Sequence, residues 1–490
     1  MHKRKSIYPI TIFLYFFLNL LLLTRHEAWR DEAQAWTIAR NLSIGEILDI
    51  LPTEGHLLPF FVILKIWNKL GGAFAGIGLI SLTIMTISVA LFLCKAPFPT
   101  WVKRLIIISP IFFYYNAVIA RCYALVVLAL ILVAITRNKL EKNMLAYCLS
   151  VAFLTQTHVL VLPLALALCV ELLIYNLARI TSKKQVVMTA IPAFSILASF
   201  LELYQKKKTA FITFDTIHNN INNAGFGLIR ERLKTIITKV YAEGRIYSIV
   251  VFLIVASIVI ISCLLLLKTN KIIKLLWPEL VVCSMGLLGY IAIIGIVRPC
   301  AHIQMALVFY MLLLFAAWII TDARNKKAQE ATQYLNDPVN YDRVARISLS
   351  FILVLFVVLS YRKELLEIKY DYFNNYSNSK TFATEAIKII PSDSEIFVRQ
   401  EDYKISAPYA YITDKRTDIV FWDVDKDAEF KCITWGKEYP EKDMEIIIKK
   451  QIQNAYYLTS EKTEIIGRPV LIAEEPNPWG ENYYLYSLKK

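Results

Sequence analysis

The sequence has no CxxC pair, although it contains eight cysteines. Most of them lie in or beside apolar segments, and only Cys432 falls in a polar stretch. This placement gives no indication of a disulfide framework or a zinc site and favours buried, apolar cysteines. The chain also lacks low-complexity stretches and repeats of fixed period, so it is not a repeat protein.

Charge is sparse as well. Charged residues make up 19% of the chain, whereas 57% of the residues are hydrophobic, and several apolar runs reach the length of about 18 residues that a membrane-spanning helix needs. These runs predict a polytopic α-helical membrane protein. The formal net charge is +14, which in this class indicates basic cytoplasmic loops and affinity for anionic lipid, not a nucleic-acid partner.

The N-terminus lacks a small-x-small cleavage site after its apolar run. We therefore expect residues 7–23 to be a retained first helix and not a cleaved signal peptide. The basic residues before it place the N-terminus in the cytoplasm, and the polar stretch after it on the outer face of the cell (plasma or inner) membrane.

Further apolar segments bring the expected number of spans to about eleven or twelve. They lie at 57–70, 73–94, 104–120, 122–136, 144–157, 159–178, 186–204, 246–268, 275–297, 303–320 and 346–361. Short basic turns between them define the cytoplasmic side. The predicted membrane domain is thus 1–361, with external loops at 25–56 and 205–245. One segment between 57 and 120 must be re-entrant, interfacial or merged with a neighbour, because otherwise Arg121 would face the wrong side.

The second external loop contains a helical pattern. Leu233 and Ile236 share one face with other apolar residues, which predicts a basic amphipathic helix on the outer leaflet. The loop itself begins with Lys206-Lys207-Lys208, and basic residues in an external loop are contrary to the positive-inside rule.

Residues 362–490 have shorter apolar runs and more charge. A helix is expected at 380–389, strands at 395–399, 417–422, 455–459, 469–473 and 483–487, and a second helix at 440–453. This alternation predicts a small extracytoplasmic α/β domain.

The stretch 25–59 concentrates ionisable groups beside tryptophans. Asp31 and Glu32 are adjacent, Trp29 and Trp36 bracket them, and the pattern beginning at Ile44 predicts an amphipathic surface helix. Carboxylates and histidines at the rim of a membrane bundle are suited to proton transfer on a lipid-borne substrate.

This stretch resembles the first external loop of the GT-C glycosyltransferases. The resemblance rests on the sequence from Trp29 to Trp36, then Gly55-His56, a stretch Ala120-Arg121-Cys122-Tyr123-Ala124-Leu125, Thr157-His158, and the basic group 298–302, in that order. The bacterial protein O-mannosyltransferase and aminoarabinose-transferase type is the most similar, over roughly residues 7–320. The chain departs from its usual His-Pro-Pro in having His56-Leu57-Leu58-Pro59.

The resemblance implies transfer of a sugar from a polyprenyl-phosphate donor to a glycan, lipid or protein acceptor on the outer face. It implies a catalytic base at Asp31, with Glu32 as a second candidate. Groups for the donor phosphate would be His56, Arg121, His158, Arg298 and His302. No cofactor is required, although Asp31, Glu32 and Glu54 offer oxygen ligands for a divalent metal. A nucleotide-sugar donor is disfavoured, since the sequence has no Gly-rich phosphate loop and no DxD in this first loop.

Plainer interpretations compete with each assignment. The carboxylates can pair with Arg25 or Arg30, Arg121 can be an interfacial anchor, and His158 can be a satisfied core histidine. At the level of the whole protein, a transporter or flippase of lipid-linked glycans and a non-catalytic scaffold of envelope assembly are the alternatives. A flippase would place charges along a midplane path, whereas here they gather on one side.

Overall fold

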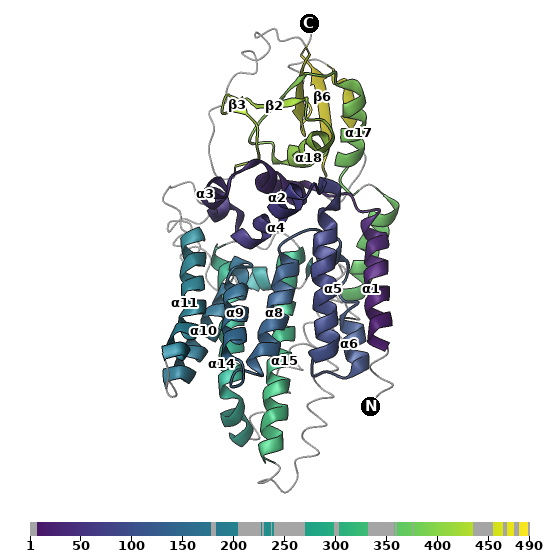
Figure 1. The fold of residues 1–490 in the computed structure, drawn as a ribbon. Coiled ribbons are helices and arrows are strands. Elements are labelled where there is room, and N and C mark those ends of the chain that lie inside the picture. Colours follow the sequence, from purple (N-terminus) through teal and green to yellow (C-terminus); the bar gives the residue numbers. More distant parts are fainter. Residues whose placement is uncertain are drawn as a thin grey trace.

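Three layers follow one another along the long axis of the molecule (Figure 1). The computed structural model describes residues 7–177, 183–203, 227, 230–236, 238–239, 270–297, 303–331, 357, 360–374, 376–434, 454–463, 468–474 and 480–488. A bundle of apolar helices forms the first layer, short helices from the N-terminal third form the second, and a small sheet with its helices forms the third (Figure 1).

Apolar helices make up the bundle. They are α1 (Ile7–Leu23), α5 (Ile77–Lys95), α8 (Tyr123–Arg137), α9 (Met144–Thr155), α10 (Leu162–Leu177), α11 (Lys183–Leu203), α14 (Asn270–Ala292) and α15 (Ile303–Ala331). Single-turn elements adjoin three of them: η2 (Phe74–Gly76), η3 (Val159–Val161) and the π-helical η4 (Ile293–Val297). Among the described residues, five helices are long and apolar enough to cross a membrane, and three apolar helices are shorter. The predicted span at 246–268 and most of that at 346–361 lie outside the described residues.

The predicted span at 57–70 is wrong. It forms α4 (Leu58–Lys69), whose 12 residues extend about 18 Å, well short of a hydrocarbon core of about 30 Å. It packs against α2 (Arg30–Asn41) and α3 (Ile44–Glu54) in the middle layer (Figure 1). Lys65 fixes it there, because the ammonium group donates to the carbonyls of Ala39 and Leu42 at 3.0 and 2.5 Å. Placing this segment outside the bundle removes one of the spans between 57 and 120, which is the change that the predicted side of Arg121 requires.

The predicted span at 104–120 is also not one helix. Its residues form α6 (Thr100–Ile106), turns, and the single-turn α7 (Tyr114–Ala117). Polar contacts stabilise this broken segment, since Asn116 donates to the carbonyl of Ile111 at 2.8 Å. Because the helix is interrupted, the backbone after α7 leads to Arg121 at the boundary with the middle layer, where it contacts Asp31 of α2.

The expected amphipathic helix in the first loop is confirmed as α3. Ser43 and Glu46 form a reciprocal capping box at its start, which satisfies two backbone donors. Gly55 ends it with φ 73°, a left-handed conformation suited to glycine. Ile47 and Leu51 are buried, while Ile44 and Leu48 are exposed. In the second loop, by contrast, Leu233 and Ile236 pack against the protein core, and 206–208 lies outside the described residues.

All five predicted tail strands are present, as part of a mixed six-stranded sheet ordered β3-β2-β1-β4-β6-β5. The strands are β1 (Glu395–Val398), β2 (Val420–Asp423), β3 (Ala428–Glu429), β4 (Ala455–Thr459), β5 (Leu471–Ala473) and β6 (Tyr483–Ser487). Central β1 pairs in parallel with β2 and β4. The predicted helix at 380–389 is α17 (Ser379–Ile389), whereas η5 (Tyr403–Ile405) and α18 (Ser406–Lys415) were not expected. The predicted helix at 440–453 lies outside the described residues.

Polar contacts attach the tail to the first loop. Glu27, only 5% exposed, accepts from the backbone N–H groups of Ser377 at 3.3 Å and of Lys380 at the start of α17. Gln34 on α2 donates to the carbonyl of Ile433 at 2.8 Å. Helix α18 also packs directly on α2 (Figure 1). The loop between the first two bundle helices is therefore covered by the last third of the chain.

Replacing Glu27 by Ala should loosen this junction. Removal of the buried acceptor leaves backbone donors unsatisfied, so we expect a loss of about 1–3 kcal/mol in the free energy of unfolding. Thermal unfolding in detergent, read together with limited proteolysis of the tail, measures the effect. The control is Glu385→Ala, which removes an exposed carboxylate on α17. Equal stability of the two variants would contradict a junction held by Glu27.

Candidate functional site

Asp31 and Arg121 form an ion pair where the middle layer meets the bundle. Asp31 lies in the first turn of α2, and the Arg121 guanidinium contacts its Oδ2. The Arg30 Nε atom lies 3.5 Å from the other carboxylate oxygen, Oδ1. Burial lowers the pKa of Arg121, but the Asp31 carboxylate, with smaller contributions from Tyr123 and Cys122, raises it, and the net shift is upward. Two guanidinium groups thus face one partly exposed carboxylate.

Two histidines adjoin this pair. His56 follows the Gly55 turn, and its Nε2 lies 3.0 Å from Nη2 of Arg121. An isolated antiparallel β-bridge joins His56 to His158, and their ring centroids are 5.2 Å apart. Tyr123 stacks on the His158 ring at 5.0 Å. The structure therefore brings together four predicted site residues, Asp31, His56, Arg121 and His158, from separate parts of the chain.

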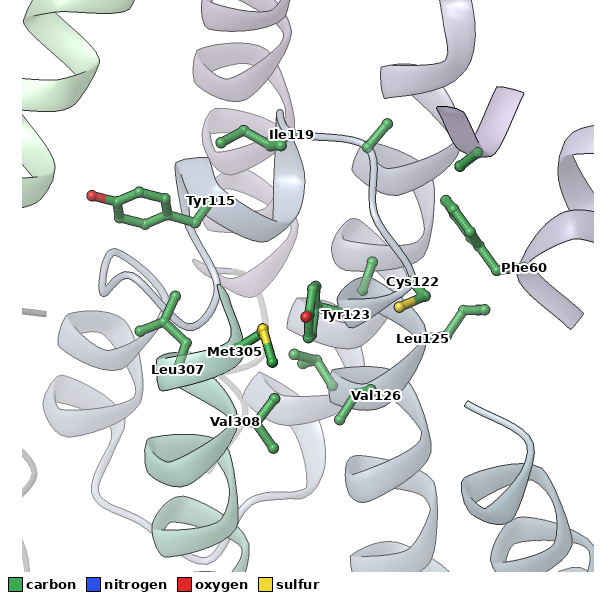
Figure 2. Packing of buried hydrophobic residues seen from close by; sticks show 14 of the residues in the cluster. Phe60, Tyr115, Ile119, Cys122, Tyr123, Leu125, Val126, Met305, Leu307 and Val308 are labelled. Atoms are coloured by element: carbon green, nitrogen blue, oxygen red, sulfur yellow. The ribbon is translucent and has the colours of Figure 1, made fainter. Parts of the chain in front are cut away.

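Cys122 also belongs to this group. Its Sγ lies 3.1 Å from Nδ1 of His56, and it is fully buried in the apolar packing between Phe60 of α4 and Met305 of α15 (Figure 2). The sequence indicates only an ordinary buried cysteine here. Among the described residues, His56, Cys122 and His158 form the group whose ligand atoms lie close enough to share one metal ion, within 4.8 Å of one another.

The hydrogen bonding of the two rings is not that of a metal site. A metal-bound histidine normally donates its second N–H to an acceptor. Here Nε2 of His56 faces an Arg121 donor, and Nδ1 of His158 accepts from the Leu160 N–H at 3.1 Å. In the neutral rings the other nitrogens therefore carry the protons. With Nδ1 of His56 facing the Cys122 sulfur, this bonding pattern differs from that of metal-bound histidine rings.

The carboxylates expected to offer metal ligands do not converge. Asp31 faces the two arginines, Glu54 accepts from the amide of Gln34 at 3.2 Å, and Glu32 points to a different set of groups. A shared divalent ion would require these side chains to leave their present partners.

Glu32 connects backbone segments. It is 1% exposed and accepts from the N–H of Ala120 at 2.6 Å and of Trp29 at 3.2 Å. Its Oε2 also lies 3.0 Å from Nε2 of His26. Because Ala120 immediately precedes Arg121, this carboxylate positions the arginine that pairs with Asp31.

His26 continues the network away from the site. Its Nδ1 lies 2.8 Å from Asp371, which also accepts from the Tyr114 hydroxyl at 2.7 Å. Burial lowers the pKa of His26, but the Asp371 and Glu32 carboxylates raise it more, so that it is about 10. No sequence motif marks Asp371, which lies 345 positions after His26.

The tail contributes a further carboxylate. Glu481 is fully buried, accepts from the Tyr483 hydroxyl at 2.8 Å and lies 3.7 Å from Nε of Arg30. The Arg30 guanidinium also lies over the rings of Trp29 and Tyr403. Burial raises the pKa of Glu481 to about 7, with a smaller upward contribution from Asp31. Glu481 is not recognisable from the sequence, because nothing in the pattern of the tail distinguishes it from a surface glutamate.

Two predicted donor-binding residues, Arg298 and His302, lie outside the described residues. Comparisons with known proteins found no match: no family model, no curated protein and no solved structure is similar to this chain. The GT-C resemblance therefore rests on the motifs quoted above.

The charged state of His26 predicts a pH-dependent stability. Its pKa in the folded protein, about 10, lies above the ordinary value of 6.5, so its stabilising contribution is complete below pH 6.5 and is lost as the pH rises through 10. His26→Asn should lower the free energy of unfolding by about 3–5 kcal/mol near pH 6. The difference from wild type should shrink toward pH 10 in denaturation curves recorded across that range. A constant difference would show that His26 is not charged.

Proposed function

We propose that this protein is a membrane glycosyltransferase of GT-C type, which moves a sugar from a polyprenyl-phosphate donor to an acceptor hydroxyl on the extracytoplasmic face of the cell membrane. One observation carries the proposal: a carboxylate, Asp31, is paired with Arg121 beside two histidines, at the end of an apolar bundle and beneath a polar domain. A lipid-linked donor and a polar acceptor would meet at such a boundary.

Arg121 would bind the donor phosphate. Guanidinium groups form bidentate, charge-assisted hydrogen bonds with phosphate oxygens. The protonated nitrogen of His158 would add a donor, and His56, held against Arg121 at 3.0 Å, would orient the guanidinium. These groups stabilise the negative charge that develops on the leaving phosphate.

The ion pair suggests an order of events. In the observed arrangement Arg121 contacts Asp31, so the carboxylate is already engaged. A donor phosphate that competes for Arg121 would draw the guanidinium away and release the Asp31 carboxylate. Donor binding would thereby prepare the base.

Asp31 would then take the proton of the acceptor hydroxyl. The hydroxyl oxygen forms a bond to the anomeric carbon, and the bond between that carbon and the phosphate oxygen breaks. Its electron pair leaves with the polyprenyl phosphate. A single in-line displacement of this kind inverts the anomeric centre. Glu32, with its hydrogen bonds to Ala120 and Trp29, acts in this scheme as a positioning residue. The scheme needs no metal.

Asp31→Asn tests the base. The amide keeps the shape but cannot accept the proton, so we expect transfer to fall by about 10²–10⁴-fold, with unchanged insertion and accumulation. The assay uses purified protein in nanodiscs, radiolabelled polyprenyl-phosphate sugars and a membrane extract as acceptor. Asp49→Asn, an exposed aspartate on α3 in the same loop, is the matched control.

The outcomes of that assay separate the alternatives. Equal activity of wild type and Asp31→Asn would keep the enzyme and assign the base to another group. Absence of transfer by folded wild type, with a membrane extract that supports another transferase, would favour the flippase or scaffold interpretation.

Glu481→Gln tests the contribution of the tail. In wild type, ionisation of Glu481 near pH 7 gives Arg30 a second anionic partner and weakens its hold on Asp31. The wild-type rate should therefore rise as the pH passes 7, and the variant should lack this rise, with a difference of about two- to fivefold above pH 7. Glu401→Gln, an exposed tail carboxylate, should keep the wild-type profile. Superimposable profiles of wild type and Glu481→Gln would rule out the coupling.

A further inference from the structure

A second group of ionisable side chains lies at the opposite end of the bundle from Asp31. A cavity of about 490 Å³ is lined there by residues of α8, α9, α10, α14 and α15 and of the turn after α8. Its polar lining includes Arg137, Tyr147, Glu171, Glu279, Asp322 and Lys326. The proposed transfer reaction uses none of these residues.

Three charged side chains of this lining, one cation and two carboxylates, contact one another. Both Nε and Nη2 of Arg137 donate to the Glu171 carboxylate, at 3.2 and 2.5 Å. The same Nη2 lies 3.3 Å from Oε1 of Glu279, whose side chain is 7% exposed. Carboxylates outnumber cations both in this triad and in the whole lining, which contains the carboxylates of Glu141, Glu171, Glu279 and Asp322 and the cations Arg137 and Lys326. Charge held among apolar helices is costly unless it is balanced. The triad therefore favours a cationic ligand.

Tyr147 provides a separate indication. Its side chain is 1% exposed and lines the cavity, yet its hydroxyl has no hydrogen-bond partner within the part of the chain that the structure describes. Buried hydroxyl groups nearly always have a partner. A ligand in the cavity with a hydrogen-bonding group would supply it.

The mouth of the cavity is basic. An adjoining cavity of about 480 Å³ shares Asn138, Glu141, Asp322 and Lys326 with the first. Lys95, Lys139 and Lys142 lie along it. Lys326 lies 3.7 Å from Glu141, and both are well exposed, while Asp322 accepts from the Trp318 indole at 2.8 Å. Anionic groups are thus favoured at the mouth and cationic groups inside.

We propose that this pair of cavities binds the headgroup of a zwitterionic phospholipid carrying ethanolamine. The ammonium group lies against Glu171 and Glu279 and contacts the Tyr147 hydroxyl. The phosphate lies among the lysines at the mouth, and the acyl chains run along exposed apolar side chains such as Ile174 of α10. Ethanolamine fits better than choline because an ammonium N–H donates hydrogen bonds to carboxylates, whereas a trimethylammonium group cannot.

Native mass spectrometry of the purified full chain in detergent tests the proposal, with dioleoyl phosphatidylethanolamine, phosphatidylcholine and phosphatidylglycerol titrated separately. We expect phosphatidylethanolamine to bind at least about tenfold more tightly than the other two, and Glu279→Gln to remove about tenfold of that affinity. Tyr147→Phe, which deletes only the hydroxyl, should weaken binding by about three- to fivefold without affecting folding. Glu385→Gln in the tail is the charge-matched control and should bind like wild type.

Three results would overturn the proposal. Equal binding of the three lipids would show a non-selective surface. Preference for phosphatidylglycerol would show a site for anions alone. Unchanged phosphatidylethanolamine affinity in both Glu279→Gln and Tyr147→Phe would place any selectivity elsewhere. None of these readouts depends on sugar transfer, so they are independent of the proposed enzyme activity.

Discussion

The buried carboxylate of Glu32 is the contact on which the site depends. It joins the start of α2 to the N–H of Ala120 and to His26, which in turn reaches Asp371. Neighbouring side chains on a helix point in different directions, so Glu32 and Asp31 serve two separate surroundings. Glu32 is enclosed and holds two backbone segments together, and Asp31 is partly exposed and faces Arg121. The two adjacent carboxylates thus differ in both burial and partners.

Further contacts hold the short helices of the middle layer in place. Three short helices, none long enough to be stable alone in water, are held by caps, by Lys65 beneath α2 and by α18 above it. Hydrogen bonds that are shielded from water by surrounding apolar groups are stronger than exposed ones. Asp31 consequently lies on a helix that is packed on both sides.

Sequence patterns predicted those helices and strands that are determined by the residues within each segment. Apolar length identified α5, α10, α11, α14 and α15, and short strand-like runs identified all five predicted tail strands. The motif order grouped His56, Arg121 and His158 with Asp31, and the structure brings these residues together. Hydropathy wrongly predicted single spanning helices at 57–70 and 104–120. Apolar residues buried within the protein have the same composition as apolar residues buried in lipid, so the sequence does not distinguish them. Asp371, Cys122 and Glu481 could not be identified, since their roles arise only from tertiary contacts between distant segments.

The contacts of Glu27 and His26 have a consequence for biosynthesis. Both residues leave the ribosome and reach their compartment among the first, whereas their partners at 371–380 come after the whole bundle. Chains are made from the N-terminus and fold as they emerge. Until residues 371–380 have been made, Glu27 and His26 lack these partners, so the loop that bears Asp31 can reach its observed arrangement only afterwards. Assembly of this loop therefore depends on segments that are translated much later.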